Sequence, residues 1–233
     1  MAFGNGPRIV TNGLVLSLDA ADQNSYVSGS ATWYDLSGNG NNGNISSSVL
    51  YNSSNGNNLG FIGNGAVLFP ENSALNTQTP TVEVWAKTNA LSQLGFWFEK
   101  GNVNTQYSLF QENANILWRQ YLTEQGTYRW ISVTTATYIN TTNWFQVAGT
   151  YTSGVRCLYI NGVLVNSDTQ TGTIPTNPNG MSVGAYGGFN GTVGGRGYYY
   201  NGNIGTVKVY NRALSAAEIA QNYNAQKSRF NLK

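Results

Sequence analysis

Short runs in which apolar and polar side chains alternate fill most of this chain, and Gly, Asn, Ser or Pro separates one run from the next. Alternation sends successive side chains to opposite faces of an extended backbone, so each run predicts a β-strand. About twelve strands follow, with no helix between them, and strands joined in this way pair antiparallel in an all-β fold. The predicted strands cover residues 14–18, 66–69, 81–87, 96–100, 107–110, 115–122, 128–135, 144–151, 156–161, 162–166, 181–185 and 204–210.

Turn residues indicate how some of these strands connect. Asn161 and Gly162 lie between two strands and predict a hairpin turn of type I′, which needs a positive φ at both positions. Residues 38–65 are largely Asn, Gly and Ser and offer little apolar surface to bury. We expect them to form long loops with one or two short strands, such as 48–51.

One helix is predicted, near the C-terminus, over about residues 216–227. Ser215 and Glu218 form the sequence pattern of a capping box, which satisfies the first free N–H groups of a helix. Ile219 and Tyr223 share one face of this helix, and we expect that stripe to pack on an edge or an end of a sheet.

The length of 233 residues suits one large all-β domain. We expect that domain to span residues 11–233, and the polar residues 1–10, which include Pro7, to form an N-terminal arm. The sequence shows no apolar segment behind an N-terminal positive charge, and no run reaches the ~18 apolar residues of a membrane span. It therefore predicts a protein without a signal peptide or a membrane span, which folds in the cytoplasm where it is made.

The composition excludes several classes of protein. Only 9% of the residues are charged and the net charge is +2, without a basic run, so nucleic-acid binding is not expected. Thirty-two Asn and 28 Gly leave neutral amides and hydroxyls to keep the surface soluble. His is absent, which removes the usual general base, the Ser/His and Cys/His nucleophiles and the commonest zinc ligand.

Five segments, taken together and in this order, resemble the laminin G-like branch of the concanavalin A-like lectin/glucanase superfamily. The resemblance implies an antiparallel two-sheet jelly-roll sandwich, here with one short C-terminal helix, whose loops gather at a rim. The segments are 13–15, 33–43, 81–87, 144–162 (at 144–151 and 158–162) and 201–215.

The two ends of the sequence, at 16–22, 33–43 and 218–230, are similar to laminin G-like proteins of tailed bacteriophages, where these are virion surface or tail components. This resemblance implies a non-enzymatic structural protein on the virion surface, as a capsid decoration or a tail or fibre appendage. Its partners would be other virion proteins, in many copies, and a host-surface glycan. A free lectin-like carbohydrate-binding module is the alternative function.

A glycoside hydrolase is a further alternative, which the sequence disfavours. Hydrolases of this superfamily carry a cluster of carboxylates along one strand, and this chain has none. Two carboxyl groups about 5 Å apart would have to come from separate strands, as Glu83 with Glu99 or Glu124.

Aromatic side chains and arginines provide two candidate glycan or partner contacts. Alternation places Trp85 on one face of its strand, and Arg119 and Tyr121 on one face of another. The three would form a groove if both faces belong to one sheet, or they could be ordinary half-buried packing, and Trp118, Trp130 and Trp144 are expected in the core. The second candidate consists of Arg196, Tyr198, Tyr199 and Tyr200.

Calcium is the cofactor that the superfamily suggests. Asp19, Asp22, Asp35 and Asn39, with Asn42 nearby, are the oxygen-rich cluster that could bind it. The alternative is that these side chains form turns by accepting hydrogen bonds from nearby backbone N–H groups.

Overall fold

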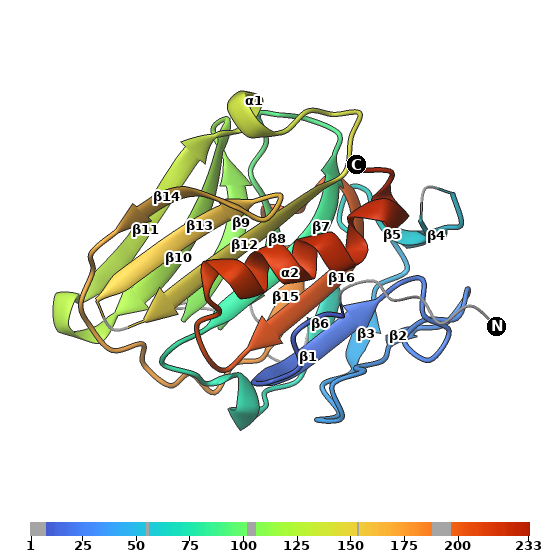
Figure 1. The fold of residues 1–233 in the computed structure, drawn as a ribbon. Coiled ribbons are helices and arrows are strands. Elements are labelled where there is room, and N and C mark those ends of the chain that lie inside the picture. The colour runs from blue at the N-terminus through green and yellow to red at the C-terminus, as the bar shows by residue number, and fades with distance from the viewer. Residues whose placement is uncertain (1–7, 55, 102–105, 153, 188–196) are drawn as a thin grey trace.

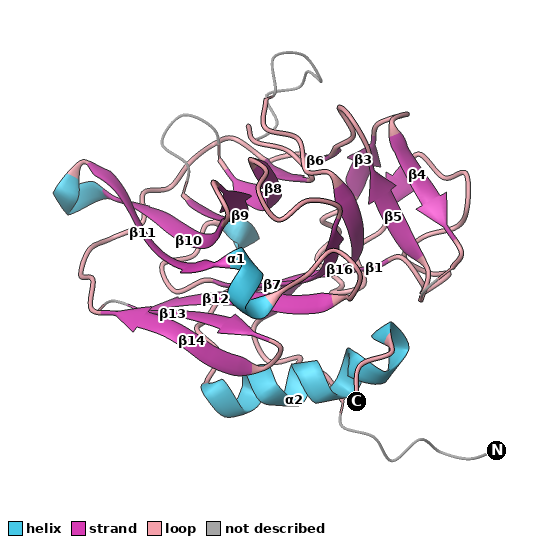
Figure 2. Cartoon of the chain, turned by 90° about the horizontal axis from the view of Figure 1, so that it is seen from above, coloured by secondary structure: helices cyan, strands magenta, loops and turns pink. Residues whose placement is uncertain are grey.

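Two antiparallel sheets of eight strands pack face to face in the computed structural model, which describes residues 8–54, 56–101, 106–152, 154–187 and 197–233. Figures 1 and 2 show the two layers, with the long C-terminal helix α2 on the outside of one of them. The predicted jelly-roll sandwich is therefore confirmed. Among the described residues, no helix is long and apolar enough to cross a membrane.

Sheet A carries α2 on its outer face. Its central strand, β16, pairs with β7 on one side and with both β5 and β1 on the other. In spatial order the strands are β14 (Val163–Asp168), β13 (Val155–Ile160), β12 (Phe145–Thr152), β7 (Thr81–Thr88), β16 (Gly202–Tyr210), β5 (Asn58–Phe61) and β4 (Val49–Asn52), with β1 (Leu14–Asp19) beside β16.

Sheet B forms the other layer, and all its neighbouring strands are antiparallel. In spatial order they are β11 (Thr127–Thr134), β10 (Asn115–Leu122), β9 (Tyr107–Glu112), β8 (Gly95–Lys100), β15 (Met181–Val183), β6 (Val67–Phe69), β3 (Gly43–Ile45) and β2 (Thr32–Trp33). Short helices connect some strands: η1 (Ser73–Leu75), η2 (Thr123–Gln125) and α1 (Thr135–Tyr138).

The main core lies between the sheets and includes Trp33, Trp97 and Trp118, all fully buried. A Cβ atom at Gly149 would lie 2.2 Å from the Trp118 ring, so only glycine leaves room for this indole. The Trp118 indole donates to the Thr150 carbonyl at 3.0 Å. Packing at this point therefore depends on a small residue in β12 facing a large one in β10.

Three short strands, β2, β3 and β5, were not predicted, and two of them lie in the Asn- and Gly-rich residues 38–65. Leu59 and Phe61 of β5 are fully buried, and β5 pairs with β16. Gly43 of β3 is required because a Cβ atom there would lie 2.4 Å from the Phe69 ring. Neighbouring strands thus supply the apolar surface that this segment lacks.

The hairpin turn at Asn161 and Gly162 is confirmed, with φ of 51° and 78°. The predicted position of the C-terminal helix is also confirmed, because α2 spans Ala216–Gln226. Its capping box of Ser215 and Glu218 is formed, and the short helix η3 (Lys227–Phe230) follows directly after α2. Hydrogen bonds from Arg212 lower the pKa of the Glu218 carboxyl to about 2.

The predicted packing of α2 on a sheet edge or end is wrong. The helix crosses the outer face of sheet A in front of β12 and β16 (Figure 1). Trp85 of β7 lies beneath it, 4.4 Å from the ring of Phe230 and 5.6 Å from that of Tyr223, stacked on both. The sheet offers aromatic surface on its outer face, and the amphipathic helix covers it.

A buried polar network joins α2 to the sheet and to the start of the described chain. The Asn222 side chain accepts from the Val10 N–H at 2.7 Å and donates to Glu83 at 2.9 Å and to the Tyr210 hydroxyl oxygen at 3.0 Å. The Tyr210 hydroxyl donates to the Val10 carbonyl at 3.0 Å. Residues 1–7 of the predicted N-terminal arm lie outside the described residues, whereas Val10 at its end is buried against the domain.

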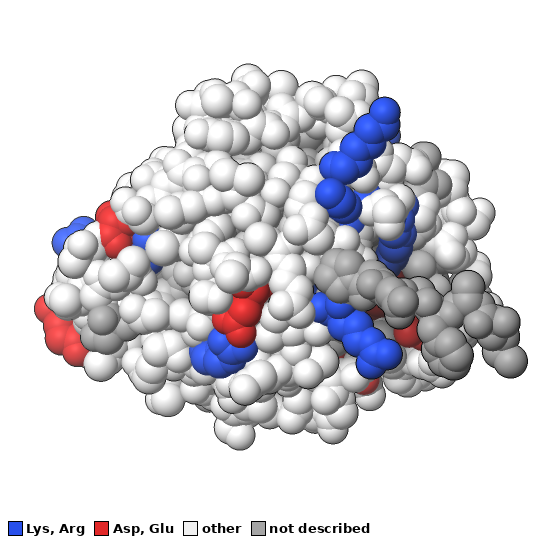
Figure 3. Space-filling model, in the orientation of Figure 1, with Lys and Arg blue, Asp and Glu red and all other residues white. Residues whose placement is uncertain are grey.

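The network also contains a buried ion pair. The Lys208 ammonium lies 3.6 Å from a Glu83 oxygen and donates to Gln226 at 2.7 Å. Burial lowers the pKa of Lys208. On the outside of this layer, by contrast, charged side chains are sparse, as Figure 3 shows for the face covered by α2.

Candidate functional site

The outer face of sheet B carries no helix in the described residues (Figure 2). Along β10, Trp118 and Gln120 point into the core, so Arg119 and Tyr121 point outward. The register of β10 with β11 places Trp130 opposite Arg119 and Tyr128 opposite Tyr121. Two adjacent strands thus present four of their aromatic and arginine side chains on one face.

Two further tyrosines from the chain after β15 complete this group. Tyr186 packs on Phe96 with ring centroids 5.0 Å apart, and Tyr198 contacts Tyr186 edge-on at 5.6 Å. We call the surface formed by these side chains the aromatic face. Its members are Arg119, Tyr121, Tyr128, Trp130, Tyr186 and Tyr198.

Arg119 lies at the centre of the aromatic face. Its guanidinium carbon is 4.7 Å from the Tyr128 ring centroid and 4.8 Å from that of Phe110, which are cation–π distances. Its Nε donates to the Ser108 hydroxyl oxygen at 3.0 Å, and Nη2 lies 3.7 Å from the fully buried carboxylate of Glu99. These contacts fix the arginine in place, so the rings around it are held in a defined arrangement.

Exposure within the aromatic face is uneven. The supporting rings of Phe96 and Phe110 are 2% exposed, whereas Trp130 is 54% exposed and Tyr198 is 53% exposed. Large aromatic side chains rarely remain this exposed without a contact partner, and their faces suit the C–H surfaces of sugar rings. The face therefore presents exposed aromatic surface that no packing within the described residues covers.

Beside Tyr121, the aromatic face borders a hollow of about 440 Å³. Its other wall is the loop of residues 175–179. The hollow thus extends the aromatic face at one end of β10.

The groove of Trp85, Arg119 and Tyr121, which required all three on one sheet, is not formed. Arg119 and Tyr121 lie together on the aromatic face, but Trp85 belongs to sheet A and is fully buried beneath α2. Alternation along each strand was assigned correctly, but the two outward faces belong to different sheets, and for Trp85 the packing alternative holds.

The second predicted cluster separates in the structure. Tyr198 joins the aromatic face, Tyr199 packs half-buried against Ala66 and Leu68, and Tyr200 is fully buried beside Trp97. Burial raises the pKa of the Tyr200 hydroxyl. Arg196 lies outside the described residues.

Three members of the aromatic face, Tyr128, Trp130 and Tyr186, were not predicted. Trp130 was expected in the core, and this is wrong because β11 is the edge strand of sheet B and Trp130 points outward there. The pairing of residues 115–122 with 127–134 as a hairpin places Trp130 opposite Arg119 and could have indicated this.

The calcium cluster is not assembled. Asp35 accepts from the N–H groups of Ser17, Ser37 and Asn41 at 2.9–3.0 Å, which is the turn-forming role given as the alternative. Asp19 pairs with Arg229 at 2.6 Å. Within the described residues, no three or more His, Cys, Asp or Glu side chains are placed to bind a metal ion.

The other two members of the calcium cluster also form local hydrogen bonds. Asp22 accepts from the N–H of Asn24 at 2.8 Å, and the Asn39 amide donates to the Ser37 hydroxyl oxygen at 2.9 Å. In Asn42, the side-chain oxygen accepts from the N–H of Asp35. These side chains therefore shape the 19–42 segment.

The Glu83–Glu99 pair of the hydrolase alternative is not formed. Glu83 is buried under α2 on the outer side of sheet A, and Glu99 is buried under Arg119 on the outer side of sheet B, so both sheets separate them. Glu124 in η2 accepts hydrogen bonds from Thr173 at 2.6 and 2.7 Å, which lower the pKa of its carboxyl.

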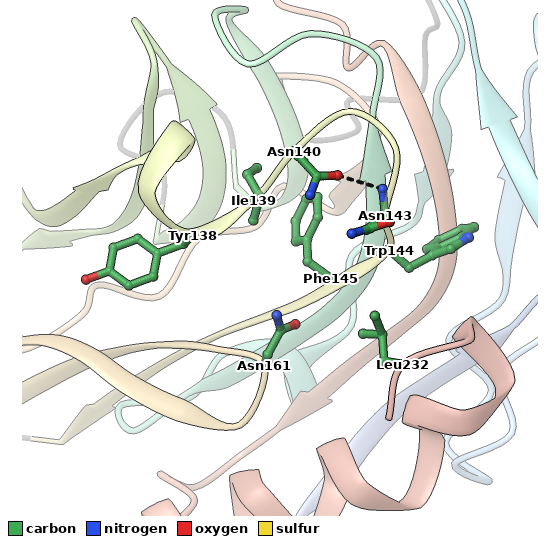
Figure 4. A pocket seen from close by; sticks show the side chains of 8 residues that line it. All are labelled: Tyr138, Ile139, Asn140, Asn143, Trp144, Phe145, Asn161 and Leu232. Atoms are coloured by element: carbon green, nitrogen blue, oxygen red, sulfur yellow. Dashed lines mark hydrogen bonds between the residues drawn. The ribbon is translucent and has the colours of Figure 1, made fainter.

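Two other hollows lie away from the aromatic face. One, of about 80 Å³, lies between the 138–145 segment, Asn161 and Leu232; in its wall the backbone N–H of Asn143 donates to the side-chain oxygen of Asn140 at 2.7 Å (Figure 4). It is too small for a sugar ring. A wider one, of about 540 Å³, lies beside Tyr26 and Tyr51 at the opposite edge of the sandwich.

Two antiparallel sheets packed face to face define the class of β-sandwich domains. This chain belongs to the concanavalin A-like lectin/glucanases superfamily, because the laminin G family model of that description matches residues 61–220, more than half of its length. The sequence resemblance to this superfamily is thus confirmed. No curated protein matches the chain.

Solved structures of similar fold include binding domains of botulinum neurotoxins. The receptor-binding domain of the C/D mosaic serotype has a TM-score of 0.70 and 19% identity, and the match covers 93% of this chain and 52% of that one. The neurotoxin DC binding domain in complex with rat synaptotagmin II gives 0.71 and 15%, covering 92% and 52%, and the same domain in complex with SialylT gives 0.69 and 16%, covering 92% and 51%. The chain spans about half the length of these proteins and shares their fold.

Proposed function

We propose that this protein is a non-enzymatic glycan-binding domain and that it binds through the aromatic face. The observation that carries the proposal is the pair of half-exposed rings, Trp130 and Tyr198, on a sheet face held rigid by Arg119. Structural neighbours determined with SialylT and with synaptotagmin II support a binding role for this fold. The separation of Glu83 from Glu99 supports a function other than hydrolysis.

A glycan array with the wild-type chain and Trp130→Ala tests this proposal. Wild type is expected to bind a subset of glycans, and Trp130→Ala to lose that binding by about tenfold or more, as the loss of one stacking contact predicts. The matched control is Tyr138→Ala, which removes an exposed tyrosine from α1, away from the aromatic face. Absence of any bound glycan, or equal binding by Trp130→Ala and wild type, would refute the proposal.

We further propose that the domain is displayed on a tailed-phage virion, in many copies and joined to other virion proteins, after assembly in the host cytoplasm. The similarity of residues 16–22, 33–43 and 218–230 to phage laminin G-like proteins supports this setting. So does the placement of the two ends: Val10 and the C-terminal residues lie on the side of α2, opposite the aromatic face (Figure 2). Attachment through that side would leave the aromatic face turned outward.

Purified particles test the virion proposal. If the domain belongs to the virion surface, an antibody raised against it labels intact particles, and mass spectrometry finds the chain in them. A chain that is absent from particles and still binds glycans would instead be the free lectin-like module.

A further inference from the structure

The hollow beside Tyr121 has the size and the position of a sugar subsite. Its volume of about 440 Å³ lies within the range of roughly 300–1,000 Å³ typical of small-molecule sites. Tyr121 belongs to both the hollow and the aromatic face, and its ring contacts Tyr128 edge-on at 5.3 Å. A glycan on the aromatic face could therefore extend into the hollow.

Buried side chains hold the loop that forms the opposite wall. The Lys100 ammonium donates to the carbonyls of Asn177 and Asn179 at 3.2 and 2.5 Å, and the Gln106 amide donates to that of Pro175 at 2.6 Å. Lys100 is fully buried and Gln106 is 1% exposed. The loop is thus fixed before any ligand arrives, which reduces the entropy cost of binding.

The residues that line the hollow carry both apolar and polar groups. The ring of Tyr121 and the ring of Pro178 offer apolar faces, while Thr123, Thr176 and Asn179 offer hydroxyl and amide groups. A pyranose ring presents the complementary surface, with C–H groups on its faces and hydroxyls at its rim.

None of the described side chains that line the hollow is charged. Glu124 and Arg129, close by in the sequence, are hydrogen-bonded to Thr173 and Gln125. A sugar carboxylate in the hollow would lose its hydration without gaining an ion pair from the lining side chains, so an acidic sugar is disfavoured there.

We propose that this hollow is a subsite for one uncharged pyranose residue at the end of a glycan. The inference rests on the proposed glycan-binding function, since the remaining sugars would lie on the aromatic face. The subsite would make glycan binding specific for a neutral end. A terminal residue that is capped with an acidic sugar would no longer fit the hollow.

The probes are immobilised neutral oligosaccharides that end in galactose, glucose or N-acetylglucosamine, and the same oligosaccharides capped with sialic acid. Thr176→Trp fills the hollow from an exposed position, and Thr142→Trp adds the same side chain at an exposed position on another loop. Tyr121→Ala removes the shared wall, and circular dichroism confirms that each variant is folded.

Wild type is expected to bind at least one neutral probe about tenfold more tightly than its capped form. Thr176→Trp and Tyr121→Ala should lower that affinity by a similar factor, while Thr142→Trp leaves it unchanged. Equal or tighter binding of capped probes, or full binding by a folded Thr176→Trp variant, overturns the subsite. If Trp130→Ala still abolishes binding in that case, the proposed function stands and only the subsite fails. A wild type that binds neither these probes nor any glycan on the array overturns both.

Discussion

Substituting Asn222 by alanine should destabilise the domain far more than an ordinary helix substitution. Asn222 is fully buried, although its helix lies on the outside of sheet A. The substitution removes hydrogen bonds to Val10 and Tyr210, worth about 1 kcal/mol each, and one to the Glu83 carboxylate, worth about 2 kcal/mol. Alanine has the higher helix propensity, which offsets about 0.5 kcal/mol of this loss. The free energy of unfolding should therefore fall by about 3–4 kcal/mol.

Urea denaturation followed by tryptophan fluorescence measures this loss, and for a domain of this length the melting temperature should fall by roughly 10 °C. The matched control is Asn224→Ala on the same helix, where the side chain is exposed. It makes the same propensity change without removing a buried contact. Free energies of unfolding for the two variants that agree within about 1 kcal/mol would refute the reasoning, because they would mean that the buried network contributes nothing.

Three further predictions concern the site, the metal and the buried lysine. Trp85→Ala should lower the free energy of unfolding by about 3–5 kcal/mol, as is usual for a buried aromatic residue. The affinity of the folded variant for glycan should equal that of wild type, and titration of the folded variant with glycan measures it. Calcium should not change the melting temperature, because the carboxylates of Asp19 and Asp35 are already hydrogen-bonded or paired; a rise on adding calcium and its reversal by a chelator would contradict this. Burial lowers the pKa of Lys100 from 10.5 to about 8, so between these values the folded state releases a proton that the unfolded state keeps. The free energy of unfolding of wild type should therefore rise relative to that of Lys100→Met as pH rises above about 8, by up to about 1.4 kcal/mol per pH unit. Urea denaturation of both proteins between pH 7.5 and about 9.5 measures this difference. Parallel pH profiles of the two free energies would contradict the prediction.

Local sequence signals predicted the strands and the C-terminal helix well. Strand 115–122 begins and ends where the alternation does, and the capping box of Ser215 and Glu218 forms at the start of α2. These features depend on neighbours a few residues away, so the sequence contains the information directly. The strand β5 was missed because its residues 58–61 show little alternation of their own, and it is held between β4 and β16, the latter more than a hundred residues later.

The candidate site was predicted only in part, for a related reason. Alternation identifies the outward side chains of a strand but does not say which sheet the strand joins or what covers it. Arg119 and Tyr121 therefore emerged as site residues, and Trp85 stayed a candidate beside them because nothing local indicates that α2 covers sheet A. Trp130 was missed because its exposure comes from the edge position of β11.

The central place of β16 in sheet A also bears on how the chain folds. Strand β16 pairs with β1, β5 and β7, which all precede it by more than a hundred residues. During synthesis the edge of each of these three strands that pairs with β16 stays unpaired until residue 210 has left the ribosome. Contacts between residues so far apart in the sequence slow folding. We therefore expect the domain to fold late, in seconds rather than milliseconds, and nascent chains that stop before β16 to be the form most prone to aggregation.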